Sequence, residues 1–566
     1  MKDSKEEVEV LEERNSNSEQ EGLVEEKTEK EVVVKEDTAQ KQNGKKGSKI
    51  IILLLVFIVI VGGLLAFFLL KDKFIKPEKT ENDVKEYKSE YRLSGNSLED
   101  FDLYFLQLEN NAKNKVYSPL SIKYALAMLS EGASGDTKAQ IDSVIGDYKA
   151  KKYTNNANMS FANAMFIRNS FKKSVKEDYT SNLSNKFGAE VIYDSFKNAN
   201  NMNLWVKNKT LNLIDNLFND EQVSGLNYIL TNALAIDMKW NKTFQAAAGE
   251  GVDNSTEPYY VKYAHEKFHE YIGAVDSNGY GYSSLAFNKN SMNAKAVEIG
   301  AAINKYDIVN ELGEENIRKT VGAEYEKWLA TEAKDDMSVE RDVNKYLDGY
   351  IKEINSNYKR LDVSTDFTFY VDDNVKVIAK DLKEYDGTTL QYVGIMPKTD
   401  TLDNYIKNIK AEDINKLISS LKEVKLENFK DGVVTKITGY IPLFKFDYEL
   451  DLINDLQKLG ITDVFDINKA DLSKISSSEK TYIGDASHKA NIEFSNEGIK
   501  AAAVTYVGGM GAVGAFDYLY DVPTEIIDLT FDNPYLFLVR DKNSGEVWFS
   551  GSVYEPIVYE KPNYNY

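Results

Sequence analysis

The sequence predicts an α+β domain preceded by one transmembrane helix, and three stretches lead to this prediction. Residues 50–70 are 21 consecutive positions without a charged or polar side chain, about the number that spans a bilayer as a helix. Helical spacing of apolar residues marks the start of the folded region, at Leu98, Phe101, Phe105 and Leu108. Strand-like alternation of apolar and polar residues follows near the C-terminus, at Ala490, Ile492 and Phe494.

Composition limits the possible functions. The chain has 566 residues, a formal charge of −21 and no cysteine. Its length allows several domains of roughly 100–200 residues each. Without cysteine there are no disulfides, thiol nucleophiles or cysteine metal ligands. Because recognition of nucleic acid needs a basic surface, a strongly acidic chain argues against it, and we expect neither a nucleic-acid partner nor a cofactor.

The first 95 residues are predicted to precede the globular domain. The acidic tail 1–49 is dense in Glu and Lys and poor in aromatics, so we expect it to be disordered, with a binding tail as the alternative. Residues 50–70 are too long for a signal peptide and no cleavage pattern follows, which predicts an uncleaved anchor. Lysines flank both sides of this segment, so charge does not decide its orientation. A charged linker, 71–95, leads to the folded domain.

Helix signals mark the beginning of the folded domain, near Asn96. The segment that ends at Glu109 has the spacing of an amphipathic helix. Ser118 and Pro119 suit the start of a second helix, and Gly132 suits its end.

Strand signals follow. Residues 228–244 predict a strand followed by Trp240 and Phe244. Residues 366–398 predict three strands, because three β-rich runs are separated by Asp-Asp-Asn and Asp-Gly turns.

One segment, 488–514, changes character along its length. It begins as a half-buried strand and then turns at Asn496-Glu497-Gly498. Small or β-branched residues follow from Ala501 to Thr505, and then four glycines within seven positions. Such a sequence has enough β-propensity to form a strand but too few large side chains to be held in a core. It can therefore stay exposed and later pair with a sheet.

The segment 488–514 resembles the hinge and reactive-centre loop of the serpins, in which a turn with Gly precedes a run of alanines that ends in Thr. Three further stretches resemble the same family: GASGDTKAQI after the Ser118 helix start, the strand, helix and ADLS region at 441–476, and the C-terminal hairpin at 532–556. The resemblance covers roughly 96–260 and 366–556. The chain is identified as a membrane-anchored, bacterial member with an insertion at about 265–365.

This resemblance implies a serpin domain at 96–556 and a C-terminal tail at 557–566. The implied fold has a large central β-sheet, two further sheets, surrounding helices and an exposed reactive-centre loop. Family members inhibit serine proteases as suicide substrates: the loop is cleaved and inserts into the central sheet, and the protease stays covalently trapped. The chain is therefore expected to be no enzyme, with no catalytic residues and no metal site. The folded domain is expected to be extracellular, anchored by a single pass in the cell membrane, because foreign proteases are met there.

The resemblance also implies the site residues. The shutter and breach, where the central sheet opens, match Ser118, Ser121, Asn232, His488 and Trp240. The hinge matches Asn496, Glu497, Gly498, Ile499, Lys500, Ala501, Ala502, Ala503, Val504 and Thr505. The residues expected to face the core after insertion are Ile499, Ala501, Ala503, Thr505 and Val507. Asn496, Ile499 and Lys500 depart from the family pattern, and the bulk of Ile499 is expected to slow the first step of insertion.

The reactive bond is predicted between Ala512 and Val513 by counting from the hinge. Counting back from the C-terminal strand lands near Pro523 instead, because the loop is about ten residues longer than usual. A small Ala512 favours an elastase-like or subtilisin-like target protease. If the bond lies further along, a chymotrypsin-like target is favoured by Phe516, Tyr518, Leu519 or Tyr520. No Arg or Lys lies between Ala501 and Pro523, which disfavours a trypsin-like target.

Two alternative functions stay open. The first is a zinc metalloprotease, because His265-Glu266-x-x-His269 would place two imidazoles and a general base on one helix face. Against it, Lys267 is charged, no third histidine is available, and a third ligand would have to be a downstream carboxylate such as Glu298. A surface pair of histidines is the preferred interpretation. The second alternative is a non-inhibitory, serpin-like surface binding module.

Overall fold

The computed structural model describes residues 85–244, 285–287, 292–356, 358–363, 366–478, 480–499, 516, 518, 520 and 522–559. Several predictions lie outside these residues: the tail 1–49, the membrane segment 50–70, most of the linker 71–95 and of the tail 557–566, the HExxH match, and the loop from Lys500 to Val513. Within the described ranges, no helix is long and apolar enough to cross a membrane.

The predicted helices at the start of the domain are present. Helix α2 (Phe101–Leu108) buries its apolar residues except Leu108, which is partly buried. Helix α3 (Pro119–Gly132) begins after Ser118, whose side chain accepts a hydrogen bond from the Ser121 N–H at 3.1 Å. It ends at Gly132, where a Cβ would lie 2.3 Å from the Ile475 side chain. Both the predicted start and the predicted end of this helix are therefore confirmed.

The largest sheet has seven strands in the order β1-β20-β19-β12-β11-β10-β13. Its members are β1 (Lys115–Tyr117), β10 (Thr368–Val371), β11 (Val375–Asp381), β12 (Leu390–Pro397), β13 (Lys422–Glu423), β19 (Tyr535–Asp541) and β20 (Val547–Val553). Strands β10, β11 and β12 are the three runs predicted in 366–398, and that prediction is confirmed. Most residues of β11, β12, β19 and β20 are buried, so this sheet forms much of the core.

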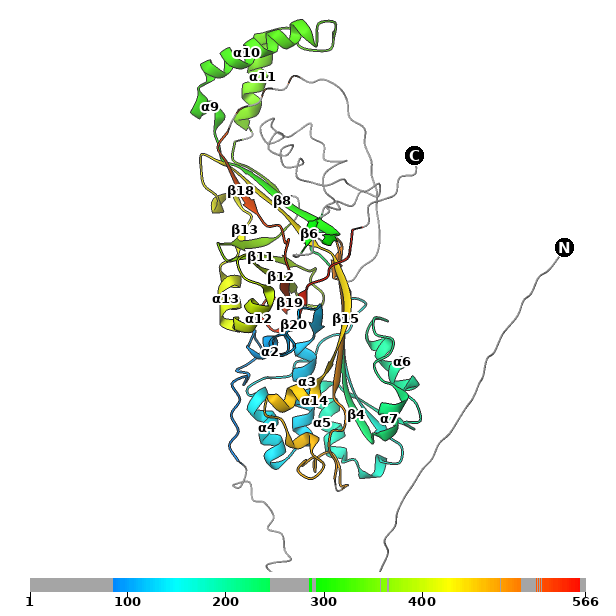
Figure 1. Ribbon diagram of the computed structural model, residues 1–566. Coiled ribbons are helices and arrows are strands. Elements are labelled where there is room, and N and C mark those ends of the chain that lie inside the picture. The colour runs from blue at the N-terminus through cyan, green and yellow to red at the C-terminus, as the bar shows by residue number, and fades with distance from the viewer. Residues whose placement is uncertain are drawn as a thin grey trace, which may run out of the picture. The chain divides into compact units, whose positions relative to one another are not determined.

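A four-stranded sheet, in the order β18-β14-β8-β9, carries a helical excursion. Its strands are β8 (Ala296–Asn304), β9 (Arg360–Val363), β14 (Val434–Pro442) and β18 (Thr524–Asp528). Between β8 and β9 lie α9 (Ile308–Leu312), α10 (Glu314–Thr331) and α11 (Val343–Ser356), which we call the three-helix segment (308–356) (Figure 1). A short hairpin, β6 (Leu285–Phe287) and β7 (Met292–Ala294), precedes β8.

The remaining strands form two sheets where one large central sheet is predicted. One sheet has the order β3-β2-β4 and the other β15-β16-β17-β5. The strands are β2 (Met159–Arg168), β3 (Glu190–Asp194), β4 (Tyr228–Ile236), β5 (Met238–Lys239), β15 (Phe444–Asp451), β16 (Ser487–Phe494) and β17 (Gly498–Ile499). Because the chain passes from β4 into β5 through Asp237 alone, the two sheets are joined at one end. The expected single sheet is thus divided, since β4 and β16 do not pair.

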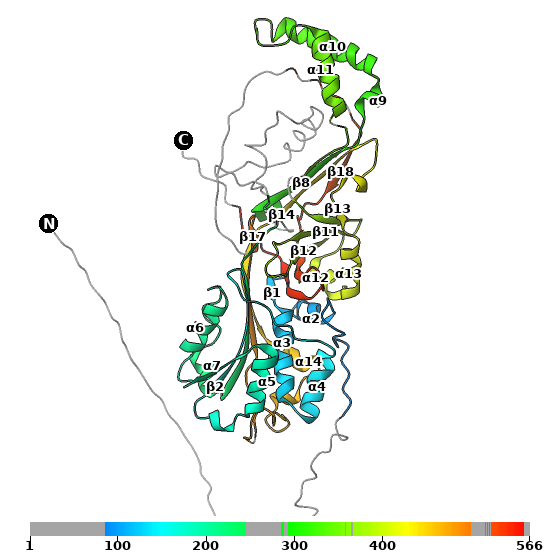
Figure 2. The same ribbon diagram turned by 180° about the vertical axis from the view of Figure 1, so that it is seen from behind.

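Helices cover both faces of the β3-β2-β4 sheet (Figure 2). Even-numbered residues of β2, such as Phe166, pack against Trp205 of α6 (Asn200–Lys209), whereas odd-numbered residues such as Met165 join the main core beside α3. A strand buried on both faces has a nearly continuous apolar sequence. The described part of the chain also contains α4 (Gly135–Ile145), α5 (Glu177–Phe187), α7 (Asp220–Gly225), α12 (Leu402–Asn408), α13 (Ala411–Ser419) and α14 (Leu452–Lys458), and the 3₁₀ turns Lys172–Ser174, Leu426–Asn428 and Asp463–Phe465.

Candidate functional site

The start of the predicted hinge forms a short strand, β17. After Phe494 the chain turns at 495–497 and returns antiparallel to β16, so that Ile499 lies opposite Phe494. On its other side, Ile499 lies opposite Met238 and Gly498 lies opposite Lys239 of β5. The first two residues of the returning chain therefore already lie between two strands.

This arrangement explains both residues of β17. A Cβ on Gly498 would lie 2.2 Å from the Met238 carbonyl oxygen, so only glycine fits so close to the neighbouring backbone. The side chain of Ile499 is buried, with 2% of its surface exposed. Sequence alone predicts that the bulk of Ile499 slows the first step of insertion. In the structure Ile499 lies opposite both Phe494 and Met238, so its side chain occupies a buried position at the start of the hinge.

Trp240 holds the turn at 495–497. Its indole N–H donates to the Ser495 carbonyl at 2.9 Å, and its backbone N–H donates to the Glu497 carbonyl at 2.8 Å. The Ser495 hydroxyl donates to the Gly498 carbonyl at 2.9 Å, which closes the turn on itself. Trp240 is fully buried against Phe494, at 5.4 Å between ring centroids. This end of the junction between the two sheets is closed.

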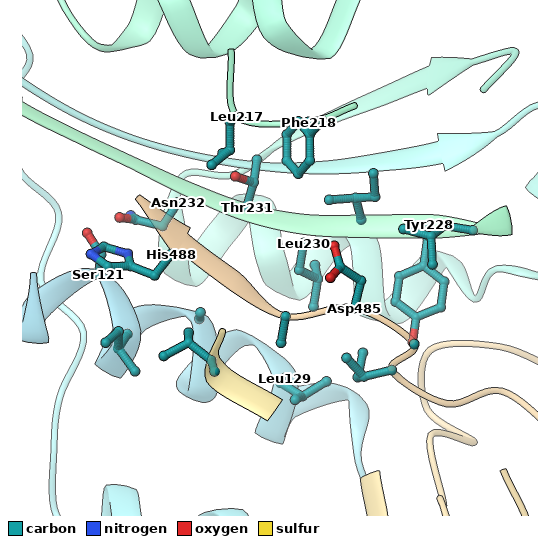
Figure 3. A pocket seen from close by; sticks show the side chains of 18 of the residues that line it. Ser121, Leu129, Leu217, Phe218, Tyr228, Leu230, Thr231, Asn232, Asp485 and His488 are labelled. Carbon is teal, nitrogen blue, oxygen red and sulfur yellow. The ribbon is translucent and has the colours of Figure 1, made fainter. Parts of the chain in front are cut away.

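Beyond the closed end, β4 and β16 diverge around a cavity of about 260 Å³. We call this space the slot. It is lined by β4 and β16, by α3, by α6 with the chain that follows it to Phe218, and by the chain at 480–486. Figure 3 shows the side chains of Ser121, Asn232 and His488 gathered at one end of the slot. A strand that entered here would meet β4 on one side and β16 on the other.

The polar residues of the slot are held by α3 and β2. The Ser118 backbone N–H donates to His488 Nε2 at 2.9 Å. Burial lowers the pKa of His488 to about 4, so the ring is neutral at pH 7 and can accept this bond. Asn232 Nδ2 donates to Asn163 Oδ1 at 2.8 Å. Among the described residues, neither Asn232 Oδ1 nor the Ser121 hydroxyl finds a hydrogen-bond partner.

The structure thus brings together the residues that the sequence singled out at distant positions. Ser118, Ser121, Asn232 and His488 line the slot, and Trp240 stands at its closed end. Among the hinge residues, Asn496 and Glu497 lie in the turn, and Gly498 and Ile499 form β17. The hinge from Lys500 to Thr505 and the bond between Ala512 and Val513 lie outside the described residues.

The alternative zinc site stays a prediction, because its two histidines lie outside the described residues. The described residues contain no group of three or more His, Cys, Asp or Glu side chains that could hold a metal ion. Glu298 lies on β8, where burial raises the pKa of its carboxyl to about 7. His265 and His269 are not among the described residues.

Two residues of the site escaped prediction, although each carries a sequence signal. Ser495 precedes the Asn-Glu-Gly turn, a position from which a hydroxyl can bond to nearby backbone. Asn163 interrupts the apolar run of β2, and a buried amide needs a polar partner. Neither signal says which distant residue completes the contact.

Comparison with known proteins identifies the class. The model of the family Serpin (serine protease inhibitor) matches residues 100–251 and 348–556. The chain therefore belongs to the serpin family. Mouse neuroserpin (Mus musculus) is 25% identical over 467 residues, which cover 78% of this chain and 86% of that protein. Human leukocyte elastase inhibitor (Homo sapiens) is 23% identical over 483 residues, covering 82% of this chain and 99% of that protein. Protease inhibition is thereby supported at the level of the family.

Solved structures show the same fold. The thermophilic serpin tengpin in its native state superimposes with a TM-score of 0.51 at 20% identity, over 83% of this chain and 96% of tengpin. Thyroxine-binding globulin in complex with thyroxine gives a TM-score of 0.51 at 15% identity, over 81% of this chain and 98% of that one. The family model leaves residues 252–347 unmatched, a range that includes α9 and α10.

Proposed function

We propose that this protein inhibits serine-type endopeptidases as a suicide substrate whose cleaved loop inserts into the slot between β4 and β16. The observation that carries the proposal is β17, because the chain leading into the loop already pairs with β16 and β5 at the closed end of the slot. Insertion would only have to lengthen a strand that has begun. Each added residue would find backbone partners on both sides, as in other cases of strand addition.

The registers of β17 predict where the loop residues would lie. If both continue, Ala501 would lie between Ile236 and Ile492, and Ala503 between Leu234 and Ala490. Thr505 would lie between Asn232 and His488. Thr505, a small polar residue, would then lie at the polar end of the slot. Ala501 and Ala503 would lie between apolar residues of β4 and β16.

The chemistry of trapping follows from cleavage between Ala512 and Val513. The protease serine oxygen attacks the Ala512 carbonyl carbon, the bond to the Val513 nitrogen breaks, and that nitrogen leaves with a proton delivered by the protease base. An ester joins Ala512 to the protease. As a strand, the chain from Ile499 to Ala512 would span roughly 45 Å at about 3.3 Å per residue, whereas the nine residues of β4 span roughly 30 Å. Insertion would therefore carry the bound protease past the end of β4.

The expected target is an elastase-like or subtilisin-like protease, because Ala512 is small. The name of the relative leukocyte elastase inhibitor supports the same class. We further propose that residues 50–70 anchor the chain in the cell membrane by a single pass, with the folded domain extracellular. The range 265–365 would be an insertion in the serpin domain, and the family model leaves its part 265–347 unmatched but matches 348–365.

The test uses the full-length chain in a mild detergent, mixed separately with elastase, subtilisin and chymotrypsin. A band at the summed mass on a denaturing gel is expected with at least one of them, and it should disappear at alkaline pH because the link is an ester. Mass spectrometry of the released C-terminal peptide then identifies the cleaved bond. A protease whose active-site serine has been blocked beforehand is the control and should give no band. Cleavage without any such band would contradict the proposal and favour the non-inhibitory binding module.

A further inference from the structure

The three-helix segment (308–356) contacts the chain that follows the reactive loop. The ring of Phe516 lies against three aromatic rings, at centroid distances of 5.0 Å to Tyr325, 5.7 Å to Trp328 and 5.9 Å to Tyr346. Two of these rings come from α10 and one comes from α11. Phe516 is thus held by residues that precede it by 170 to 191 positions in the sequence.

The receiving surface is built by the helices themselves. Tyr325 and Tyr346 stack with 3.7 Å between centroids and 10° between ring planes. The Tyr325 hydroxyl donates to the Glu340 carbonyl at 2.6 Å, which fixes the ring against the connection between α10 and α11. Trp328 stacks on Tyr325 from one helical turn further along. The rings that contact Phe516 are therefore held in place by one another and by the α10–α11 connection.

The contact continues along the chain as far as β18. Tyr518, Tyr520 and Val522 pack into the apolar cluster that α9 and α11 make with β8 and β14. Tyr520 is 8% exposed, and burial raises the pKa of its hydroxyl to about 12. The Pro523 carbonyl then accepts a hydrogen bond from the Val434 N–H at 2.9 Å, and β18 begins at Thr524.

We propose that the three-helix segment is a clamp that holds Phe516, Tyr518, Tyr520 and Val522 and thereby decides which bonds of the loop a protease can reach. The inference rests on the proposed function, because it concerns the same loop as protease bait. A serine protease takes the residue before the cleaved bond into a pocket of its own. Phe516 and Tyr520 would have to leave their clusters to enter such a pocket. The clamp therefore directs cleavage to residues 500–515. Bonds that follow the aromatic residues are cleaved less readily, because those side chains are held.

The position of the clamp also suits loop insertion. It lies entirely on the C-terminal side of the bond between Ala512 and Val513. After that bond is cut, the part from Ile499 to Ala512 is no longer connected to the clamp and is free to insert. An uncleaved loop would have to break the contacts of the clamp before it could insert equally far between β4 and β16. The clamp would thus favour insertion after cleavage over insertion before it.

The experiment measures where chymotrypsin cuts the full-length chain, kept in a mild detergent, with each new terminus identified by mass spectrometry. A synthetic peptide of residues 508–526 is the unclamped reference. Three variants are compared: Trp328→Ala opens the receiving surface, Phe516→Ala removes the same contact from the loop side, and Lys327→Ala changes an exposed neighbour on α10. Elastase cleavage within 500–515 is followed in parallel.

Cleavage after Tyr518 and Tyr520 should be at least about tenfold slower in the protein than in the peptide, because a protease cuts only the population that has left the clamp. Both Trp328→Ala and Phe516→Ala should raise this rate about tenfold, the scale expected when two or three aromatic pairs are lost. Lys327→Ala should not change it, and elastase cleavage should change less than twofold in all variants. Because Phe516→Ala leaves the packing between the helices intact, it reports on the clamp even if Trp328→Ala folds poorly.

Equal rates in the protein and the peptide, or no change in either variant, would overturn the clamp. The readout is independent of trapping. If no stable protease complex forms but cleavage stays within 500–515, the clamp stands and the proposed function fails. If a stable complex forms after cleavage at Phe516, Tyr518 or Tyr520, the proposed function stands and the clamp fails.

Discussion

The two ends of the junction between β4 and β16 are built differently. At the closed end, β17 pairs with both β16 and β5, Trp240 secures the turn, and Gly498 allows the backbones to approach. At the open end, the same two strands are separated by a cavity of about 260 Å³ that contains polar side chains. Within the described residues, backbone pairing therefore joins the two sheets at the closed end, whereas β4 and β16 do not pair at the open end.

The largest expected effect is on the open end. Thr505→Arg would bring a charge between Asn232 and His488 if the registers of β17 continue, and burying an unpaired charge costs several kcal/mol. Insertion should stall, so the protease hydrolyses its ester and leaves. We expect the trapped fraction on a denaturing gel to fall by at least about tenfold, with the rate of loop cleavage nearly unchanged. Val504→Arg, on the outward side of the same strand, is the matched control and should keep most of the trapping. Equal losses in both variants would contradict the register.

The next effect is a pH dependence of the open end. The pKa of His488 is lowered from about 6.5 to about 4 by burial, so folding favours the neutral ring. The stabilisation is fully present above pH 6.5 and is lost as the pH falls towards 4, by up to about 3 kcal/mol. His488→Gln keeps an acceptor for the Ser118 N–H but cannot be protonated. Urea unfolding should therefore show a smaller loss of stability between pH 6.5 and 4 in this variant.

His265→Gln makes the same change at a histidine that the sequence predicts to be on the surface, and it should retain the wild-type pH dependence. If His488→Gln loses stability with pH as the wild-type chain does, the titrating group lies elsewhere.

A smaller effect is expected at the closed end. Gly498→Ala would place a Cβ 2.2 Å from the Met238 carbonyl oxygen, so the backbone must shift. Overpacking of this kind costs about 2 kcal/mol, and the midpoint of urea unfolding should fall accordingly. Gly225→Ala, at the end of α7 where a Cβ meets nothing within 4 Å, is the control and should not lower the midpoint. An unchanged midpoint in Gly498→Ala would show that β17 does not contribute to the stability of the native chain.

The smallest expected effect on stability comes from the ion pair between Lys239 and Glu497 at the closed end. Lys239 Nζ lies 3.8 Å from Glu497 Oε2, and the Lys239 side chain is half exposed. Because surface ion pairs contribute about 0–1 kcal/mol, Lys239→Ala should change the free energy of unfolding by less than about 0.5 kcal/mol at low salt. The same measurement at high salt should show no difference between the variant and the wild-type chain. A larger effect would mean that charge holds β17 in place, and not backbone pairing and Trp240.

Much of the fold was predictable because its signals are local. The start of α3 at Ser118 and its end at Gly132 depend on residues next to each other in the chain. The three strands in 366–398 also have local signals, because the turns between them are indicated by Asp and Gly residues. The site residues could be named only through the resemblance, because a lone serine or histidine carries no sign of its partner. Ser118 and His488 are 370 residues apart in sequence, and Trp240 and Ser495 are 255 apart.

By itself, the sequence determined the composition of the predicted loop: a glycine turn, small residues with β-propensity, and no basic residue from Ala501 to Pro523. Tertiary structure alone decided that the predicted central sheet is divided, that Ile499 is already paired, and that Phe516 lies against α10 and α11. The physical reason is that propensity and capping act over a few neighbouring residues. Whether two strands pair or stay apart depends on everything that packs around them.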